Sequence, residues 1–281
     1  MCPSSRVARA SATIVLIMQA CLAYCSIGAE PRPKRVGEIA TPSGFERIEA
    51  PPGSFSYFMR NLALLEDNRV HLYDGRLKRN QSAQYRVVDL DVGNRDLQQC
   101  ADAIIRIRAE YFFKTNQKSR IVFHFTSGDQ SSYEQWARGY RPIISGSKVS
   151  FVRRASVSHS YENFKSYLWN LFTYAGTISL RMDSLSVQKP QIGDFFLQSG
   201  SPGHAVLIMD AAKRQSDGKL VYLLGQSYMP AQQFHVLRNP SSDAFAPSND
   251  SNEGVWYSLD AAVPLETPEW TFPADSLRRW R

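Results

Sequence analysis

Three apolar segments in the second half of the chain, each about as long as a β-strand, limit the possible folds more than any other part of the sequence. Short polar loops separate them, and one of these loops has the sequence Gly-Ser-Pro-Gly. Segments with this spacing are expected to lie side by side as antiparallel strands of one sheet. The predicted strands are Asp194–Gln198, His204–Ala211 and Leu220–Gln226.

Two helices are predicted ahead of these strands. After Gly93, apolar residues recur every three or four positions from Leu97 to Tyr111, with Asp96 as the expected N-cap. Tyr161–Phe172 repeats the same spacing with aromatic side chains, which are expected to pack in the core. Helices followed by a run of antiparallel strands indicate an α+β fold.

Length and composition favour one globular domain. Apolar residues make up 43% of the 281 residues, which excludes a disordered or fibrous chain. Residues 30–53 are rich in Pro, Gly and basic residues without periodicity, and are predicted to be a linker. Residues 54–281 show no second boundary and no repeat, so they are predicted to form a single domain.

The N-terminus has the pattern of an export signal. Arg6 and Arg9 precede the apolar run 10–23, and small residues end the segment at Ala29. Residues 1–29 are therefore predicted to be a signal peptide, and the protein is expected in the periplasm or cell envelope. The segment before Cys25 also resembles a lipoprotein signal, so a lipid anchor through Cys25 is the alternative. The apolar run is shorter than the ~20 residues that a membrane-spanning helix needs.

Charge gives little information about partners. There are 33 Lys and Arg against 26 Asp and Glu, a formal net charge of +7, and both signs are interspersed. No nucleic-acid partner is therefore indicated. Asp89 and Asp91 lack Cys or His neighbours at ligand spacing, so no metal site is predicted, and no phosphate-binding glycine loop is present.

A single cysteine remains after the predicted signal is removed. The other three precede Ala29, so no intrachain disulfide is expected, and Cys100 is either a buried apolar residue or a reactive thiol. Its place near the start of the first predicted helix would favour a thiolate, because unpaired N–H groups and the helix dipole attract an anion. A thiolate in that position is a candidate nucleophile.

A histidine and a polar residue fall where they could serve that thiol. His204 begins the second predicted strand directly after a loop. A hairpin centred between residues 215 and 216 places residue 204 opposite residue 227, so Gln226 or Ser227 is predicted beside the imidazole. Either side chain could orient the ring as the third member of a Cys-His-polar triad.

The order of these residues resembles the papain-like superfamily. A cysteine on a helix is followed by a strand that starts Gly-Asp-Phe-Phe, a strand that starts Gly-His-Ala-Val and a strand with a polar end. The closest similarity is to NlpC-type peptidases and CHAP-type amidases of bacterial cell walls. The segments DLQQCADAIIRIRAEY, SPGHAVLIMD and GQSYMPAQQFHVLRNP are also similar to an uncharacterised exported bacterial domain family.

This resemblance implies a nucleophile helix packed on an antiparallel sheet and roles for particular residues. Cys100 would be the nucleophile, His204 the general base and acid, and Gln226 the orienting residue. Gln99 and Ser227 are expected to contact the substrate, and the oxyanion to meet the N–H of Cys100 together with Gln98 or Gln99.

The implied activity is hydrolysis of an amide bond in a peptide or peptidoglycan, with no metal or organic cofactor. Two alternatives remain open: a catalytically silent envelope protein that binds a peptide or glycan in the same cleft, and an acyltransferase that forms a thioester.

Overall fold

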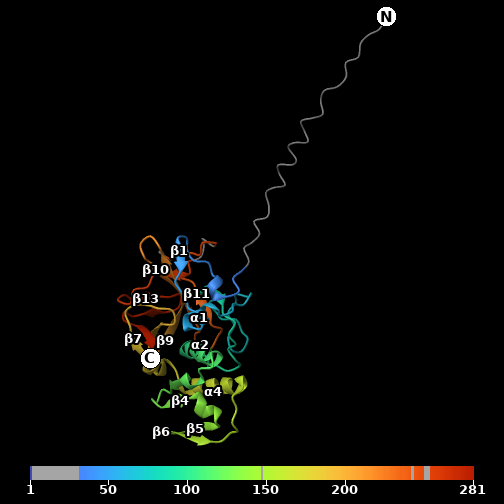
Figure 1. Ribbon diagram of the computed structural model, residues 1–281, viewed down its shortest axis with the longest axis vertical. Helices are drawn as coiled ribbons and strands as arrows, with labels where there is room; N and C mark the ends of the chain where they lie inside the picture. The colour runs from blue at the N-terminus through green and yellow to red at the C-terminus, as the bar shows by residue number, and fades with distance from the viewer. Residues whose placement is uncertain (2–31, 147, 242–243, 250–253) are drawn as a thin grey trace. The chain divides into compact units, whose positions relative to one another are not determined.

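The computed structural model describes residues 1, 32–146, 148–241, 244–249 and 254–281 (Figure 1). The predicted signal peptide, apart from its first residue, and the alternative lipid anchor at Cys25 lie outside these residues. Residues 33–281 form one compact unit. Among the residues described, no helix is both long enough and apolar enough to cross a bilayer.

One large antiparallel sheet organises this unit, which confirms the predicted α+β class. Its main path runs in the order β2-β11-β10-β9-β8-β15-β7, with β1 paired to β9 and β12 to β10. The strands are β1 Phe45–Arg47, β2 Gln84–Val87, β7 Ser184–Ser186, β8 Phe195–Gln198, β9 His204–Arg214, β10 Leu220–Gln226, β11 His235–Leu237, β12 Trp256–Tyr257 and β15 Leu277–Trp280.

The three strands predicted from the sequence are the centre of this sheet. Alternate residues of β9 belong to two separate apolar clusters, Leu207 to the larger and Val206 to the smaller, as the two-residue period of a strand requires. Because β9 is covered on both faces, its sequence is almost continuously apolar. The tail contributes as well, since β15 pairs with β8 and β7.

The helices are α1 Phe55–Arg60, α2 Cys100–Lys114, α3 Tyr133–Ala137, α4 Tyr161–Tyr174 and α5 Thr177–Met182, with 3-10 turns η1 Val36–Glu38 and η2 Lys118–Arg120. Helix α2 is buried on most sides because it packs on β9 and lies between the sheet and a second lobe (Figure 1).

That lobe is built from the chain between α2 and β8. It contains α3, α4 and two hairpins, β3 Val122–His124 with β4 Gln130–Ser132, and β5 Tyr140–Ser145 with β6 Lys148–Arg153. Aromatic rings of α3 and α4 pack edge to face, as in the pair Tyr133 and Phe164. Phe164, Leu168 and Phe172 of the stripe predicted for α4 are core, whereas Tyr161 at its start is 39% exposed. A small hairpin, β13 Leu265–Glu266 with β14 Thr271–Phe272, lies in the C-terminal segment.

Helix α2 starts three residues later than the Asp96 N-cap predicts. The N-cap is Gln99, whose N–H donates to the carboxylate of Asp102 at 3.2 Å. Asp96 instead accepts hydrogen bonds from the Gln99 side-chain amide and from the Ala231 N–H. It therefore connects the segment before α2 to the loop that contains Ala231. As a result Cys100 is the first residue of the helix.

The predicted linker needs correction for residues 33–53. Val36 and Ile39 are fully buried, and β1 pairs with the far end of β9. The Asp210 carboxylate, which is completely buried, is bonded to Arg47 and Arg60, at 2.7 Å each. Residues 33–53, which are rich in Pro and lack periodicity, are therefore held in the fold by pairing with distant residues. The local sequence pattern gives no sign of this pairing.

Candidate active site

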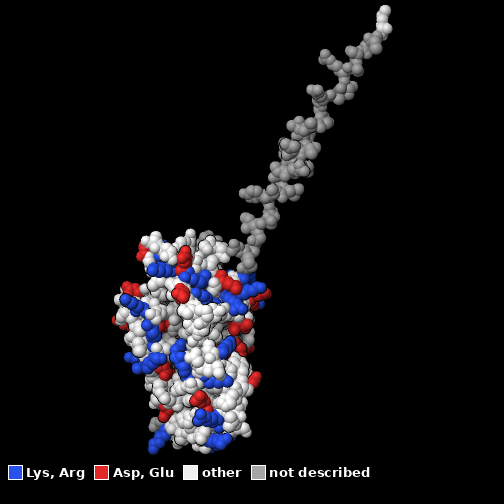
Figure 2. Space-filling view, in the orientation of Figure 1, with Lys and Arg blue, Asp and Glu red and all other residues white. Residues whose placement is uncertain are grey.

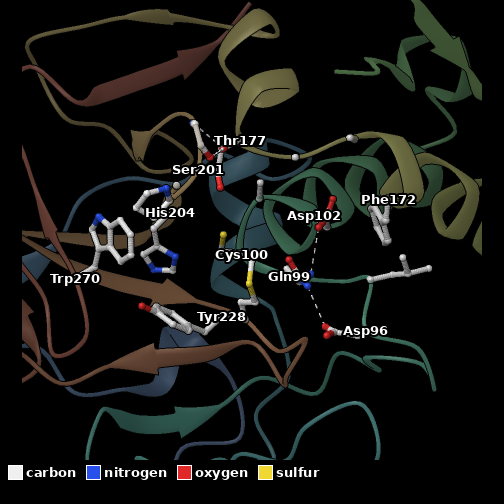
Figure 3. Close-up of a pocket in the computed structure, with 18 residues that line it drawn as sticks. Asp96, Gln99, Cys100, Asp102, Phe172, Thr177, Ser201, His204, Tyr228 and Trp270 are labelled. Atoms are coloured by element: carbon white, nitrogen blue, oxygen red, sulfur yellow. Dashed lines mark hydrogen bonds between the residues drawn. The ribbon is translucent and has the colours of Figure 1, made fainter. Parts of the chain in front are cut away.

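A cavity of about 630 Å³ opens where the start of α2 meets the start of β9. Its walls come from the first turn of α2, the loops ahead of α5 and β9, and the aromatic side chains Tyr228 and Trp270. Figure 3 shows Cys100 in the middle, His204, Tyr228 and Trp270 on one side, and Gln99 and Asp102 on the other. The cavity therefore collects residues that are more than 100 positions apart in the sequence.

Cys100 lies at the point where the helix has free N–H groups. The N–H groups of the first helical residues have no carbonyl partner within the helix. The backbone N–H groups of Ala101 and Cys100, and that of Ala205 on β9, lie near the thiol and act to lower its pKa. The nucleophile candidate is thus held between the helix start and the residue that follows His204.

Burial nevertheless keeps this thiol protonated at rest. Only 6% of Cys100 is exposed, and burial, with a smaller contribution from Asp102, raises the pKa of the thiol from 9.0 to about 12. A rise of that size corresponds to about 4 kcal/mol, more than the ~2 kcal/mol that a helix N-terminus supplies at most. The expectation of a thiolate stabilised by the helix dipole does not fit the resting site.

His204 is neutral at rest for the same reason. Burial lowers the pKa of its imidazole from 6.5 to about 4, against the opposing effect of the hydrogen bond to Gln226. The rings of Tyr228, Trp270 and Phe272 surround the imidazole, with centroids 4.6, 5.2 and 5.7 Å away. The Cys100 and His204 pair is thus a thiol and an imidazole, and a proton would have to move as a reaction proceeds.

Gln226 is the partner of the imidazole. Its Oε1 lies 2.8 Å from His204 Nε2. The hairpin of β9 and β10 is shifted relative to the predicted centre, since Leu220 pairs with Lys213 and a bulge follows Leu223. Of the two residues predicted beside the histidine, Gln226 and Ser227, the one that contacts it is Gln226, although the predicted register is wrong.

An ionic group that the sequence did not indicate lies behind Gln226. The Gln226 side-chain Nε2 donates to Glu269 Oε2 at 2.8 Å, and Lys78 Nζ lies 2.5 Å from the same oxygen. Asn80 donates to the other oxygen, Oε1, at 3.1 Å. The only hint in the sequence is a glutamate directly between Pro268 and Trp270.

Gln99 and Ser227 occupy different environments. Gln99 lines the cavity, but its backbone N–H already donates to Leu97 O and Asp102, so that N–H is not available to an oxyanion. Ser227 is not part of the cavity wall. Its hydroxyl donates to the carbonyls of Gln98 and Gln232, at 3.3 and 2.8 Å, so its role in the structure is to fix the loop ahead of α2.

Other charged groups near the site have structural roles. Asp91 is paired with Lys165 at 2.5 Å. In the described ranges, no group of three or more His, Cys, Asp or Glu residues could hold a metal ion. Figure 2 shows both signs of charge interspersed on the visible face, without a continuous basic surface.

Comparisons with known proteins identify a family but no characterised relative. A model of the family described as Domain of unknown function (4846) matches residues 36–279, which is nearly the whole compact unit. No curated protein and no solved structure matches the chain.

Proposed function

The chain belongs to that family of unknown function, so its chemistry has to be inferred from the site, and we propose that it is an exported cysteine peptidase or amidase with a papain-like plan. The observation that carries the proposal is the convergence of Cys100 and His204 on one cavity, with Gln226 bonded to the imidazole. Cys100 begins a helix, His204 begins a strand packed on that helix, and Gln226 orients the imidazole from the next strand.

The hydrogen bond to Gln226 supports a particular proton path. Because His204 Nε2 is bonded to Gln226 Oε1, Nδ1 is the nitrogen left to accept the thiol proton. As the sulfur attacks the carbonyl carbon, the thiol proton passes to Nδ1. It then passes to the leaving nitrogen as the C–N bond breaks. Water hydrolyses the resulting thioester, again with His204 as the base, and the thiol is restored.

The start of α2 offers donors for the intermediate. The N–H groups of Cys100 and Ala101 act to lower the pKa of the thiol, and they are the donors proposed for the oxygen of a carbonyl under attack. These two N–H groups take the place of the Gln99 N–H as oxyanion donors, because the Gln99 N–H already donates to Asp102. In this proposal the oxyanion is held by the helix start alone.

The proposed substrate is a peptide or a peptidoglycan stem. The cavity combines the apolar side chains Phe172, Met229 and Trp270 with the polar groups of Gln99 and Thr177, which suits an amide-containing chain. The location in the cell envelope and the choice of peptidoglycan rest on the signal-like N-terminus and on the resemblance to cell-wall enzymes.

One observation favours the silent binding protein as a second candidate. Burial leaves the Cys100 thiol protonated and the His204 imidazole neutral, which is also what an inert pair in a binding cleft would show. The two candidates differ in whether Cys100 forms a covalent bond.

Hydrolysis of defined substrates tests the proposal. Purified protein is incubated with cell-wall stem peptides and a mixed peptide library, and new amino groups are measured for wild type, Cys100→Ala and His204→Ala. Replacement of the exposed His159 by Ala is the matched control. We expect hydrolysis by wild type and the control, and a loss of at least about 10³-fold in the two site variants. Peptide binding by wild type and Cys100→Ala with equal affinity and no cleavage would select the binding protein.

A further inference from the structure

The ionic group behind Gln226 has no part in the proton path described above. The side chains of Lys78 and Glu269 are only 6% and 12% exposed, and their charged atoms are 2.5 Å apart. Asn80 and Gln226 donate to the same carboxylate, at 3.1 and 2.8 Å. The carboxylate of Glu269 therefore accepts from three donors in two parts of the chain, and one of them is the residue that orients His204.

These contacts fix which way the Gln226 amide faces. An ionised carboxylate can only accept hydrogen bonds, so the Gln226 atom that faces Glu269 has to be the NH₂ group. The amide oxygen is then turned toward His204. Lys78 and Asn80 reinforce this arrangement, because both also donate to the Glu269 carboxylate.

The direction of the amide in turn fixes the imidazole. An amide oxygen is only an acceptor, so His204 Nε2 has to carry the hydrogen. A neutral imidazole carries one N–H hydrogen, and Nδ1 is left with its lone pair. We propose that Glu269 is a positioning residue that sets the tautomer of His204 through Gln226. This inference rests on the proposed function, because the lone pair on Nδ1 matters only if His204 takes the thiol proton.

No other described neighbour of the imidazole selects a tautomer. The rings of Tyr228, Trp270 and Phe272 pack against it, and the ionisable groups around it are Cys100 on α2, Lys78 and His235. Within the described residues, its one side-chain hydrogen bond is the bond to Gln226. The hydrogen bond to Gln226 therefore determines whether Nδ1 or Nε2 of His204 carries the hydrogen.

The tautomer can be read directly by NMR in protein labelled with ¹⁵N-histidine, since two-bond ¹H–¹⁵N correlations distinguish Nε2–H from Nδ1–H. We expect Nε2–H for His204 in wild type.

In Glu269→Gln the new amide donates as well as accepts, so Gln226 can turn over and Nδ1–H should appear. Cys100 alkylation at neutral pH should then slow at least about threefold, in proportion to the lost Nε2–H population. The matched control is Asp194→Asn, since Asp194 is likewise a buried carboxylate in an ion pair, with Arg279 at 2.7 Å, but does not contact Gln226.

The outcomes separate this inference from the proposed function. Nδ1–H in the wild-type spectrum, or an unchanged Nε2–H in Glu269→Gln, would overturn the role of Glu269. The first of these results needs no variant, so the inference stays testable if Glu269→Gln does not fold. A tautomer that shifts in Glu269→Gln, together with Cys100 reactivity that is unaffected by His204→Ala, would support the positioning role and reject the cysteine hydrolase.

Discussion

At the scale of single residues, burial decides the chemistry of the site more than local position does. The sequence places Cys100 near a helix start and His204 at a strand start, and both positions are correct within a few residues. The same sequence suggests a thiolate, whereas burial raises the pKa of the thiol to about 12 and lowers that of the imidazole to about 4. Desolvation depends on what covers a residue, and nothing in the neighbouring sequence reports it.

Ser227 shows the same limit at a residue that seemed to belong to the site. We expect Ser227→Ala to lower the free energy of unfolding by about 1 kcal/mol, because a buried hydroxyl loses its bond to the Gln232 carbonyl. The alkylation rate of Cys100 should stay within about twofold of wild type, since the side chain lies outside the cavity wall. Urea unfolding and alkylation kinetics measure the two effects. A tenfold fall in rate without loss of stability would instead assign Ser227 to the site.

At the scale of elements, segments with a long apolar run or a helical period could be predicted, and segments held by distant partners could not. β8, β9 and β10 contain continuous apolar runs, and α4 follows a 3.6-residue pattern. The alternating stretches 71–73 and 85–90, joined by the turn Asp74-Gly75, also predict a hairpin. That prediction is wrong, because β2 pairs with β11 and His71 bridges to Leu77. The strands in residues 33–53 and in the C-terminal segment are too short for their sequence patterns to predict them. Their positions depend on pairing with the rest of the sheet.

The Asp210 ion pairs should show that residues 33–60 belong to the folded unit. We expect Asp210→Asn to lower the free energy of unfolding by about 3 kcal/mol, because it leaves Arg47 and Arg60 without their buried partner. Denaturant unfolding measures the change. Asp217→Asn, which breaks an exposed pair with Arg214, is the control and should have no measurable effect. Equal, small effects of both substitutions would mean that the segment acts as a linker.

At the scale of the whole molecule, two buried histidines lie close together in the sheet and make its stability depend on pH. Burial lowers the pKa of His235 from 6.5 to about 3, with a further contribution from Lys78 and from His204. The unfolded chain therefore binds a proton below about pH 6.5 that the folded protein excludes. This contribution to stability is complete above that pH and is lost as the pH falls toward 3.

Substitution of His235 separates its contribution to the pH dependence of stability from the contributions of other buried titratable groups. Because Nδ1 of His235 donates to the Gln233 carbonyl at 2.9 Å, Asn at this position keeps a donor near the same place. Between about pH 7.5 and pH 5, the free energy of unfolding of His235→Asn should fall by about 2 kcal/mol less than that of wild type. Urea titrations at both pH values give the comparison. Parallel losses in the two proteins would mean that His235 titrates normally when folded.

The central claim is that His204 activates Cys100, and the most direct test is the rate of Cys100 alkylation by iodoacetamide in the folded protein as a function of pH. Wild type is compared with His204→Ala, and His159→Ala is the control. We expect the wild-type rate at neutral pH to exceed that of His204→Ala at least about tenfold. The two rates should converge at high pH, where hydroxide removes the thiol proton. Equal rates at every pH, or alkylation only after unfolding, would contradict the claim and make Cys100 a core residue.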